Sequence, residues 1–228
     1  MGRTFSLLRI LFIALIVVSA LLVLTNLLVA ATFGIHLSDG LQSSYDTYSL
    51  MVEVNNTLVL LALIISIGGG VCLIVWTRRA FIVSQSAPVV QAARKYSRGM
   101  AVAWWFIPIG NLFMPKKVIS EIERSLKVAA DTTEYSGDWN LRPVERKGTL
   151  WWVLFVVGAL LGSGSSSSET DAQGFLLEDV VYQNAVGSAI SRAFIVVSLF
   201  FGISYLRQVT KLAEKLENTQ RSSGSSTD

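Results

Sequence analysis

The stretch GMAVAWWFIPIGNLFMPKK, residues 99–117, decides how this chain is arranged at a membrane. It is apolar enough to enter a bilayer, and Lys and Arg frame it at both ends. Yet it contains Pro108, Asn111 and Pro115, and a straight transmembrane helix tolerates an interior proline poorly. The segment therefore crosses the bilayer, dips into it and returns, or lies along its surface.

The composition indicates a membrane protein. Of 228 residues, 52% are hydrophobic and 15% are charged, whereas soluble domains average about 25% charged residues. The mean hydropathy is +0.53. The one cysteine, Cys72, excludes an intrachain disulfide. The lone histidine, His36, has no cluster of ligands beside it, so we expect no metal site and no cofactor.

Four stretches are long and apolar enough to cross the hydrocarbon core, which requires about 20 helical residues. They are residues 10–33, 58–76, 148–164 and 185–206. The first is alternatively a cleaved signal peptide, but its apolar run exceeds the about 7–15 residues typical of a signal peptide core. The expected fold class is an all-α integral membrane protein with four transmembrane helices. Aromatic residues at the span ends are expected at the headgroup level, namely Trp76, Trp151, Trp152 and Tyr205.

The distribution of charge predicts the orientation of these spans. Cytoplasmic loops are enriched in Lys and Arg. With both termini cytoplasmic, 18 of the 19 basic residues fall on one side, and the opposite loops, 34–57 and 163–184, contain none. The exception is Arg192 in the fourth span. A fifth span through residues 99–115 would divide the basic residues between the two sides, so this segment is expected to enter and leave on the cytoplasmic side.

Residues 99–115 are therefore expected to be re-entrant or interfacial. Pro108 lacks a backbone N–H and costs about 3 kcal/mol inside a straight helix. The simplest arrangement is a short helix through Trp104-Trp105, a break at Pro108 and a return to Pro115. Asn111 offers a polar partner for backbone groups freed by the break. The alternative is a flat interfacial helix that only anchors the loop.

An amphipathic helix is predicted over residues 116–130. Its apolar stripe has helical spacing and comprises Val118, Ile119, Ile122, Leu126 and Ala129 or Ala130. Its other face carries Lys116, Lys117, Glu121, Glu123, Arg124 and Lys127. Glu123 and Lys127 have the spacing of an i,i+4 ion pair. This helix either lies on the membrane surface or packs, solvated, on its own bundle.

A single membrane domain is expected over residues 1–217. Beyond the fourth span an apolar stripe extends the helix into the cytoplasm, formed by Leu206, Val209, Leu212 and Leu216. Residues 218–228 are rich in Ser and Gly and are expected to be a disordered tail.

Several motifs give the chain a family resemblance. They are Trp76 with Arg79-Ala80, the run WWFIPIGNL over residues 104–112, Pro115, Glu121-Ile122, and Leu150-Trp151-Trp152 at the start of the third span. In these motifs, over about residues 58–213, the chain resembles the bacterial membrane family catalogued as domain-of-unknown-function 4328. The resemblance implies the fold, the membrane location and a bacterial source, and it implies no activity. Members tend to have an aromatic residue where this chain has Lys116, and tryptophan where it has Glu123.

The sequence offers little catalytic chemistry. The spans hold no acid or histidine at mid-depth, and no nucleotide-binding, hydrolase or zinc-protease motif is present, so we expect no catalytic residues and no enzyme. An ionisable residue inside a membrane is a usual pointer to function. Arg192 is the candidate. It contacts an anion or substrate, pairs with Glu178, Asp179 or Glu53 at the outer face, or reaches toward the outer headgroups. The run Gly68-Gly69-Gly70 either lines a pore or forms a close contact between helices.

Two sets of residues are candidates for function. The first is the broken motif itself, formed by Trp104, Trp105, Pro108, Asn111 and Pro115. The second consists of basic residues that attract anionic headgroups with about 1 kcal/mol each near a membrane surface. Its members are Arg78, Arg79, Arg94, Lys95, Arg98, Lys116 and Lys117. Topology alone is an alternative explanation for these basic residues.

Two functions remain open from the sequence. The first is a non-enzymatic scaffold, or a module that interacts with a partner or with lipid, in the plasma membrane of a bacterium. The second is a small transporter or channel that uses the broken segment around Pro108, since broken segments often line transport sites. The expected partners are the bilayer, its anionic headgroups, and a protein partner or second copy. No nucleic acid is expected.

Overall fold

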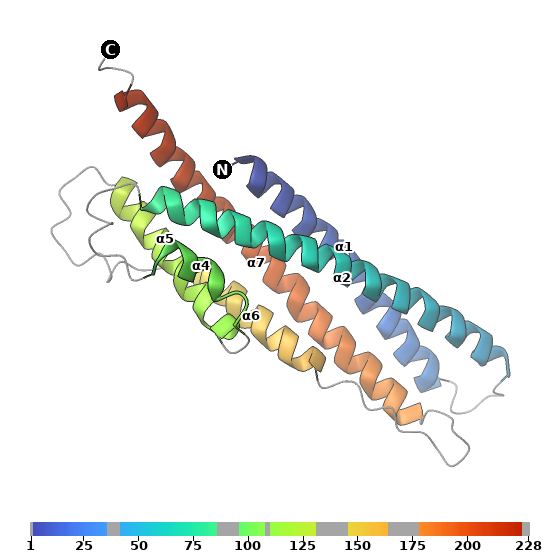
Figure 1. The fold of residues 1–228 in the computed structure, drawn as a ribbon. Helices are drawn as coiled ribbons and strands as arrows, with labels where there is room; N and C mark the ends of the chain where they lie inside the picture. Colours follow the sequence, from blue (N-terminus) through green and yellow to red (C-terminus); the bar gives the residue numbers. More distant parts are fainter. Residues whose placement is uncertain are drawn as a thin grey trace. The chain divides into compact units, whose positions relative to one another are not determined.

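Helices form the whole of the regular structure that the computed structural model describes, and no strand occurs among these residues (Figure 1). The described residues are 2–35, 42–85, 96–107, 110–130, 146–163 and 178–224. Side chains are described for residues 2–31, 49–85, 96–107, 110–129, 146–162 and 180–218. The elements are α1 (Gly2–Ile35), α2 (Gln42–Ser84), α4 (Arg98–Ala103), the 3₁₀ turn η1 (Gly110–Leu112), α5 (Met114–Ala130), α6 (Arg146–Ser163) and α7 (Glu178–Gly224).

Three helices are long and apolar enough to cross a membrane. They cover Gly2–Ala31 in α1, Ser49–Ser84 in α2 and Val180–Asn218 in α7. The helices α1, α2 and α7 each contain one of the predicted spans. Three predicted spans are therefore matched by suitable helices. The remaining predicted span, residues 148–164, falls on α6, which has 18 residues. That α6 also crosses stays a prediction.

The helices extend beyond the apolar spans, and this corrects two predicted boundaries. α2 begins at Gln42, so most of the predicted outer loop 34–57 is helical. α7 continues to Gly224, past the predicted start of the tail at residue 218. Once a helix is nucleated, each further residue adds a backbone hydrogen bond at little cost, so helices continue outside the apolar run. Residues 131–145, and residues 164–177 of the predicted outer loop 163–184, lie outside the described residues.

The chain divides into two compact units that share the long helices. Unit 1 comprises residues 1–10, 68–152 and 201–228, and unit 2 comprises residues 11–67 and 153–200. All but one of the 19 Lys and Arg residues belong to unit 1. The exception is Arg192 in unit 2. The division by packing therefore coincides with the charge asymmetry that the sequence predicts.

Unit 2 has a thin core. Its buried clusters are small, one around Val18, Leu22 and Ala62, the other around Val29, Ala30 and Ala185. Polar bonds join α1 to α2, since Asn26 Nδ2 donates to Asn55 Oδ1 at 3.2 Å. Large apolar side chains remain on the outside, and Leu60, Leu63, Ile64 and Ile67 of α2 are each more than half exposed. Helices that face lipid need no protein cover for such residues.

Within unit 2, α6 and α7 pack through small residues. Ser191 Oγ on α7 donates to the carbonyl oxygen of Gly158 on α6 at 2.8 Å. A Cβ atom on Gly162 would lie 2.8 Å from the same Oγ, and one on Gly158 would lie 3.0 Å from Ile195. Glycines four residues apart allow helix backbones to approach closely in membranes. The close approach of α6 to α7 therefore depends on Gly158 and Gly162.

Unit 1 has the thicker core. The largest fully buried side chains, Leu22 excepted, all belong to it, and they include Trp76, Tyr205, Phe81, Ile119 and Leu206. α5 contributes its apolar stripe, with Val118, Ile119, Ile122 and Leu126 each no more than 1% exposed. Unit 1 thus buries apolar surface against protein, as water-soluble domains do.

Gly70 provides a test of the glycine triplet. A Cβ atom added at Gly70 would meet nothing within 4 Å, so this residue is not a close helix contact. Because glycine is about 1 kcal/mol less favourable than alanine inside a helix, we expect Gly70→Ala to leave stability unchanged or raise it by up to about 1 kcal/mol. Thermal unfolding in detergent, followed by circular dichroism, measures this. A clear loss of stability would show that the site makes a contact after all.

Candidate functional site

The hairpin between α4 and α5 begins with a capped helix. Ser97 is the N-cap of α4, and its Oγ accepts a hydrogen bond from the backbone N–H of Met100 at 3.2 Å. α4 ends at Ala103. Beyond it the backbone hydrogen bonds join residues three positions apart, from Trp105 N to Val102 O and from Phe106 N to Ala103 O. The helix therefore stops before Trp104-Trp105 and does not run through them as predicted. In a helix Pro108 could not donate to the carbonyl oxygen of Trp104, four residues earlier, and its ring would clash with that carbonyl, which favours an end before the proline.

The return of the hairpin is closed by backbone bonds. The backbone N–H of Asn111 donates to Ile107 O at 2.7 Å, and that of Phe113 donates to Gly110 O at 3.1 Å. Asn111 thus provides a hydrogen-bond partner for a carbonyl group of the turn, and it does so with its backbone N–H. A Cβ atom on Gly110 would lie 2.8 Å from the Trp104 ring, so only glycine permits this approach. Pro108 and Ile109 lie outside the described residues.

The turn of the hairpin exposes apolar side chains. We call Phe106, Ile107, Leu112 and Phe113 the hairpin tip. Phe106 is 71% exposed and Phe113 is 60% exposed, while Ile107 and Leu112 are 44% and 37% exposed. Four adjacent exposed apolar residues are typical of a surface that contacts another apolar phase.

The two tryptophans of the motif lie behind the tip and are half-buried. Their indole nitrogen atoms are fully buried and find no hydrogen-bond partner among the described residues. Pro115 is also buried. The motif therefore divides into an inner part, formed by the tryptophans and Pro115, and an outer apolar tip.

Aromatic contacts tie the hairpin to α6. Trp152 Nε1 donates to the carbonyl oxygen of Leu112 at 2.7 Å. The Trp152 ring also packs edge to face with Trp105, with centroids 6.2 Å apart. Trp151 packs edge to face on Trp152 at 5.9 Å and lies 6.1 Å from the ring of Tyr205. A continuous series of rings therefore leads from the tip into unit 1.

This arrangement corrects the position expected for the aromatic residues of the span ends. Trp76, Trp151, Trp152 and Tyr205 are all less than 8% exposed, so they line the interior of unit 1 and not an outward belt. Trp76 Nε1 donates to Thr210 Oγ1 at 3.0 Å. Internal hydrogen bonds and ring contacts satisfy these side chains in place of lipid headgroups.

Two glycines make room for the rings between α6 and α7. A Cβ atom on Gly148 of α6 would lie 2.6 Å from Tyr205 of α7. A Cβ atom on Gly202 of α7 would lie 2.7 Å from Trp151 of α6. Each helix therefore offers a glycine to the aromatic ring of the other. Each glycine precedes the aromatic residue on its own helix by three positions. This shared spacing is the sequence pattern from which the contact could have been predicted.

A charged cluster is buried between α5 and α7. Tyr205 Oη donates to Glu123 Oε2 at 2.8 Å, and Lys127 Nζ pairs with Glu123 Oε1 at 2.6 Å. The predicted i,i+4 ion pair is confirmed. Its location differs from the prediction, since Glu123 is 1% exposed and Glu121 is 5% exposed. The expected solvated face of the helix is thus internal at these two positions, because α7 supplies a phenol to one of them.

Tyr96 lies close enough to Glu121 of α5 to feel its charge. Burial raises the pKa of the Tyr96 hydroxyl above its usual value, and the charge of Glu121 raises it further. The two buried carboxyl groups of α5, Glu121 and Glu123, are two positions apart and therefore flank its apolar stripe on different sides.

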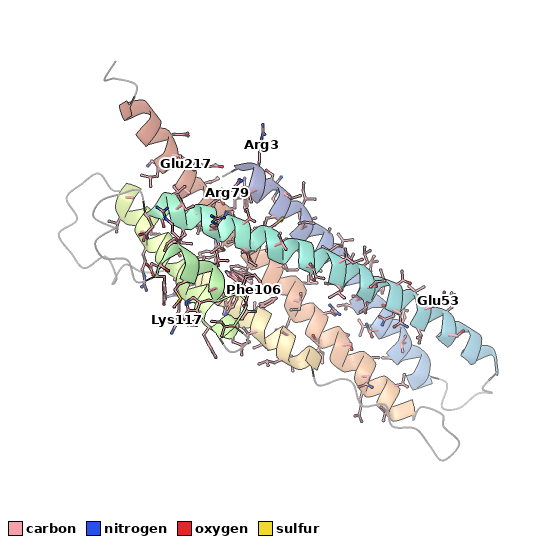
Figure 2. All side chains as sticks on the ribbon, in the orientation of Figure 1. Arg3, Glu53, Arg79, Phe106, Lys117 and Glu217 are labelled. Atoms are coloured by element: carbon pink, nitrogen blue, oxygen red, sulfur yellow. The ribbon has the colours of Figure 1, made fainter. Side chains whose placement is uncertain are left out.

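The predicted lipid-binding cations do not form one cluster in the described contacts. Arg78, Arg98 and Lys117 are exposed and Lys116 is half-buried. Arg79 is partly engaged, since its Nη1 donates to Thr4 Oγ1 of α1 at 2.6 Å. Arg94 and Lys95 lie outside the described residues. Of the described set, Lys116 and Lys117 are nearest in sequence to the hairpin tip, and Lys117 is labelled with Phe106 in Figure 2.

Arg192 lies in unit 2 and is half-buried. Among the residues whose side chains are described, no acid pairs with it and no hydrogen bond is formed by it. Glu53, one expected partner, is exposed, and the side chains of the others, Glu178 and Asp179, are not described. Elsewhere in the described part of the chain, no group of three or more His, Cys, Asp or Glu residues could hold a metal ion. Cys72 is half-buried and free.

The described residues form helices without strands, and three of these helices are long and apolar enough to cross a membrane, which is consistent with a helical membrane protein. A family model described as "Domain of unknown function (DUF4328)" matches residues 39–211. The chain belongs to this family, which confirms the resemblance carried by its motifs. Neither the curated proteins nor the solved structures gave a match to the chain.

Proposed function

We propose that the chain is a four-span protein of the bacterial plasma membrane with both termini in the cytoplasm. In this arrangement unit 2 is surrounded by lipid, and unit 1 holds the cytoplasmic ends of the spans together with a non-enzymatic module that interacts with lipid or a protein partner. The observation that carries the proposal is the coincidence of two independent features. The basic residues and the thick, protein-packed core both belong to unit 1, whereas exposed apolar helix faces dominate unit 2.

The scaffold reading rests on how unit 1 is built. Its interior is filled by large aromatic side chains and a satisfied ion pair, and its outward features are an apolar tip and exposed cations. Such a surface binds by apolar contact and by charge. It offers no described set of nucleophile, base and oxyanion donors of the kind that catalysis requires.

A transporter or channel is the second candidate. Arg192 favours it, because it is a half-buried charge in a predicted span with no described partner, and such residues often mark ion or substrate pathways. In this case the segment around Pro108 would line the pathway. The backbone bonds that close the hairpin, and its attachment to Trp152, favour a fixed element over a moving gate.

Cysteine labelling in oriented vesicles tests both candidates. In a Cys72→Ala background, single cysteines replace Phe106, Asn111 and Phe113, and membrane-impermeant maleimide is added from either side. We expect reaction from the cytoplasmic side or protection at these positions, and none from outside. Lys211→Cys is the cytoplasmic control and Leu50→Cys, at a position 61% exposed near the outer end of α2, is the external control.

Three outcomes separate the proposals. Reaction of Asn111→Cys from outside alone would overturn the topology. Reaction of the hairpin positions from both sides would favour the transporter over the scaffold. Reaction of both control positions from the same side would contradict the four-span arrangement itself.

A further inference from the structure

We propose that the hairpin tip is a shallow wedge in the cytoplasmic leaflet, and that Lys116 and Lys117 hold anionic phospholipid headgroups beside it. This inference rests on the proposed function, because it requires unit 1 to lie on the cytoplasmic side and α6 to enter the bilayer. It goes further by fixing how deep the segment reaches and which lipids it recognises.

The bond between Trp152 and Leu112 sets the depth of the tip. Trp152 lies five residues beyond Lys147, the last charged residue before the apolar part of α6. At about 1.5 Å per helical residue this is about 7–8 Å along α6. Because Trp152 Nε1 donates to Leu112 O at 2.7 Å, the tip lies at the same level. The middle of a hydrocarbon core about 30 Å thick lies much deeper.

The exposed side chains of the tip match that depth. Phe106 and Phe113 are the most exposed members of the tip. Leu150 and Val153 of α6, near Trp152 in sequence, are also about half exposed. Apolar groups of an interfacial element are buried about 5–10 Å into the boundary between headgroups and acyl chains. The tip and the start of α6 therefore present their apolar groups to the same layer.

The charges at the base of the tip favour anionic lipid over a neutral one. Lys116 and Lys117 are in the first turn of α5, immediately after the tip. The nearest acids on α5, Glu121 and Glu123, are buried, and Glu123 pairs with Lys127. The two lysines form no ion pair with any described residue, and Lys117 is exposed. A protein partner would have to enter the lipid layer to cover a tip held at the level of Trp152.

Spin labels measure the depth directly. In the Cys72→Ala background, nitroxides at Phe106→Cys and Phe113→Cys are examined in proteoliposomes for collisions with oxygen and with a nickel chelate. We expect both to lie about 5–10 Å below the lipid phosphates. Lys211→Cys is the aqueous control, and Val197→Cys, an exposed position in a predicted span, is the deep control.

The outcomes test the wedge separately from the proposed membrane arrangement on which it rests. Nickel access at Phe113 equal to that at Lys211 would overturn the wedge while the spans stand. A depth at Phe113 equal to that at Val197 would also overturn it, in favour of a re-entrant segment. Free nickel access at Val197 would overturn the proposed membrane arrangement as a whole.

A lipid-retention experiment tests the headgroup site with a charge-matched control. The protein is purified from membranes containing phosphatidylglycerol and phosphatidylcholine, and the lipid retained is measured by mass spectrometry. Replacing Lys116 and Lys117 with glutamine is expected to lower the preference for phosphatidylglycerol about fivefold for each charge removed at low salt. The same replacements at Lys211 and Lys215, exposed on α7, should have little effect. Equal losses in both pairs, or no loss in either, would contradict a specific site at the tip.

Discussion

Replacing Gly148 with alanine is expected to lower the free energy of unfolding by about 3 kcal/mol. The new Cβ atom would lie 2.6 Å from Cζ of Tyr205 and 2.8–2.9 Å from its two Cε atoms, which is far inside van der Waals contact. The ring is 2% exposed, so its displacement would disturb closely packed neighbours. Overpacking of this kind costs about 1–3 kcal/mol. Displacement of the ring also weakens the hydrogen bond from Tyr205 to Glu123, which places the expected loss at the upper end.

Unfolding in mixed micelles, followed by circular dichroism, measures the loss. Gly202→Ala is expected to behave similarly, because its Cβ atom would lie 2.7 Å from Trp151 Nε1. Gly70→Ala is the matched control, since the same chemical change there meets open space. If Gly148→Ala and Gly70→Ala shift stability equally, the close packing of α6 against Tyr205 is wrong.

Replacing Glu123 with alanine is expected to cost about 2–3 kcal/mol. Removal of one partner of a buried ion pair costs about 3–5 kcal/mol when the other charge stays buried. Here the side chain of Lys127 is 26% exposed and can reach water, which lowers the cost. The alanine also leaves a space between α5 and α7 and removes the acceptor of the Tyr205 hydroxyl.

A double-mutant cycle separates the hydrogen bond from the packing. Tyr205→Phe keeps the ring and removes only the hydroxyl, and we expect a loss of about 1.5–2 kcal/mol, as for a hydrogen bond to a charged group. Combined with Glu123→Ala, it should add much less than this, giving a coupling of at least about 1 kcal/mol. Glu53→Ala, at an exposed position on α2, is the control and should change stability by less than about 0.5 kcal/mol. Full additivity of the Tyr205 and Glu123 changes would contradict the buried bond.

The apolar spans were predictable because they depend on local composition. A run of about 20 apolar residues is sufficient to identify a membrane helix, and the runs in α1, α2 and α7 were found in this way. The full lengths of the helices were not predictable by the same reasoning. The first turns of α2, which include Ser43, Ser44 and Asp46, are polar, so hydropathy gives no sign that the helix begins there.

The positions of the aromatic residues were not predictable from span ends alone. A tryptophan at the end of a span favours the headgroup layer unless the protein offers it an internal site. Here the internal sites exist because Gly148 and Gly202 leave space for the rings on the facing helix. The partner of each ring is distant in sequence, so the spacing of glycine and aromatic on one helix was the local signal.

Glu123 illustrates a similar limit at the candidate site. Its local pattern correctly predicted the ion pair with Lys127, which is one helical turn away. Its burial depends on Tyr205, which is 82 positions away in the sequence, and no local pattern reports such a contact. The motif around Pro108 was recognisable as broken, but its attachment to α6 through Trp152 required the three-dimensional arrangement.

The exchange of glycines and rings between α6 and α7 restricts how these helices can move. Tyr205 lies against Gly148 and Trp151 lies against Gly202, so a displacement along the helix axis would carry each ring away from its glycine. A shift of one turn, about 5.4 Å, would drive both rings against residues that have side chains. In unit 1, α7 therefore cannot act as a piston that slides past α6. We expect these two helices to tilt jointly when they move, with the hairpin carried along by the bond from Trp152 to Leu112.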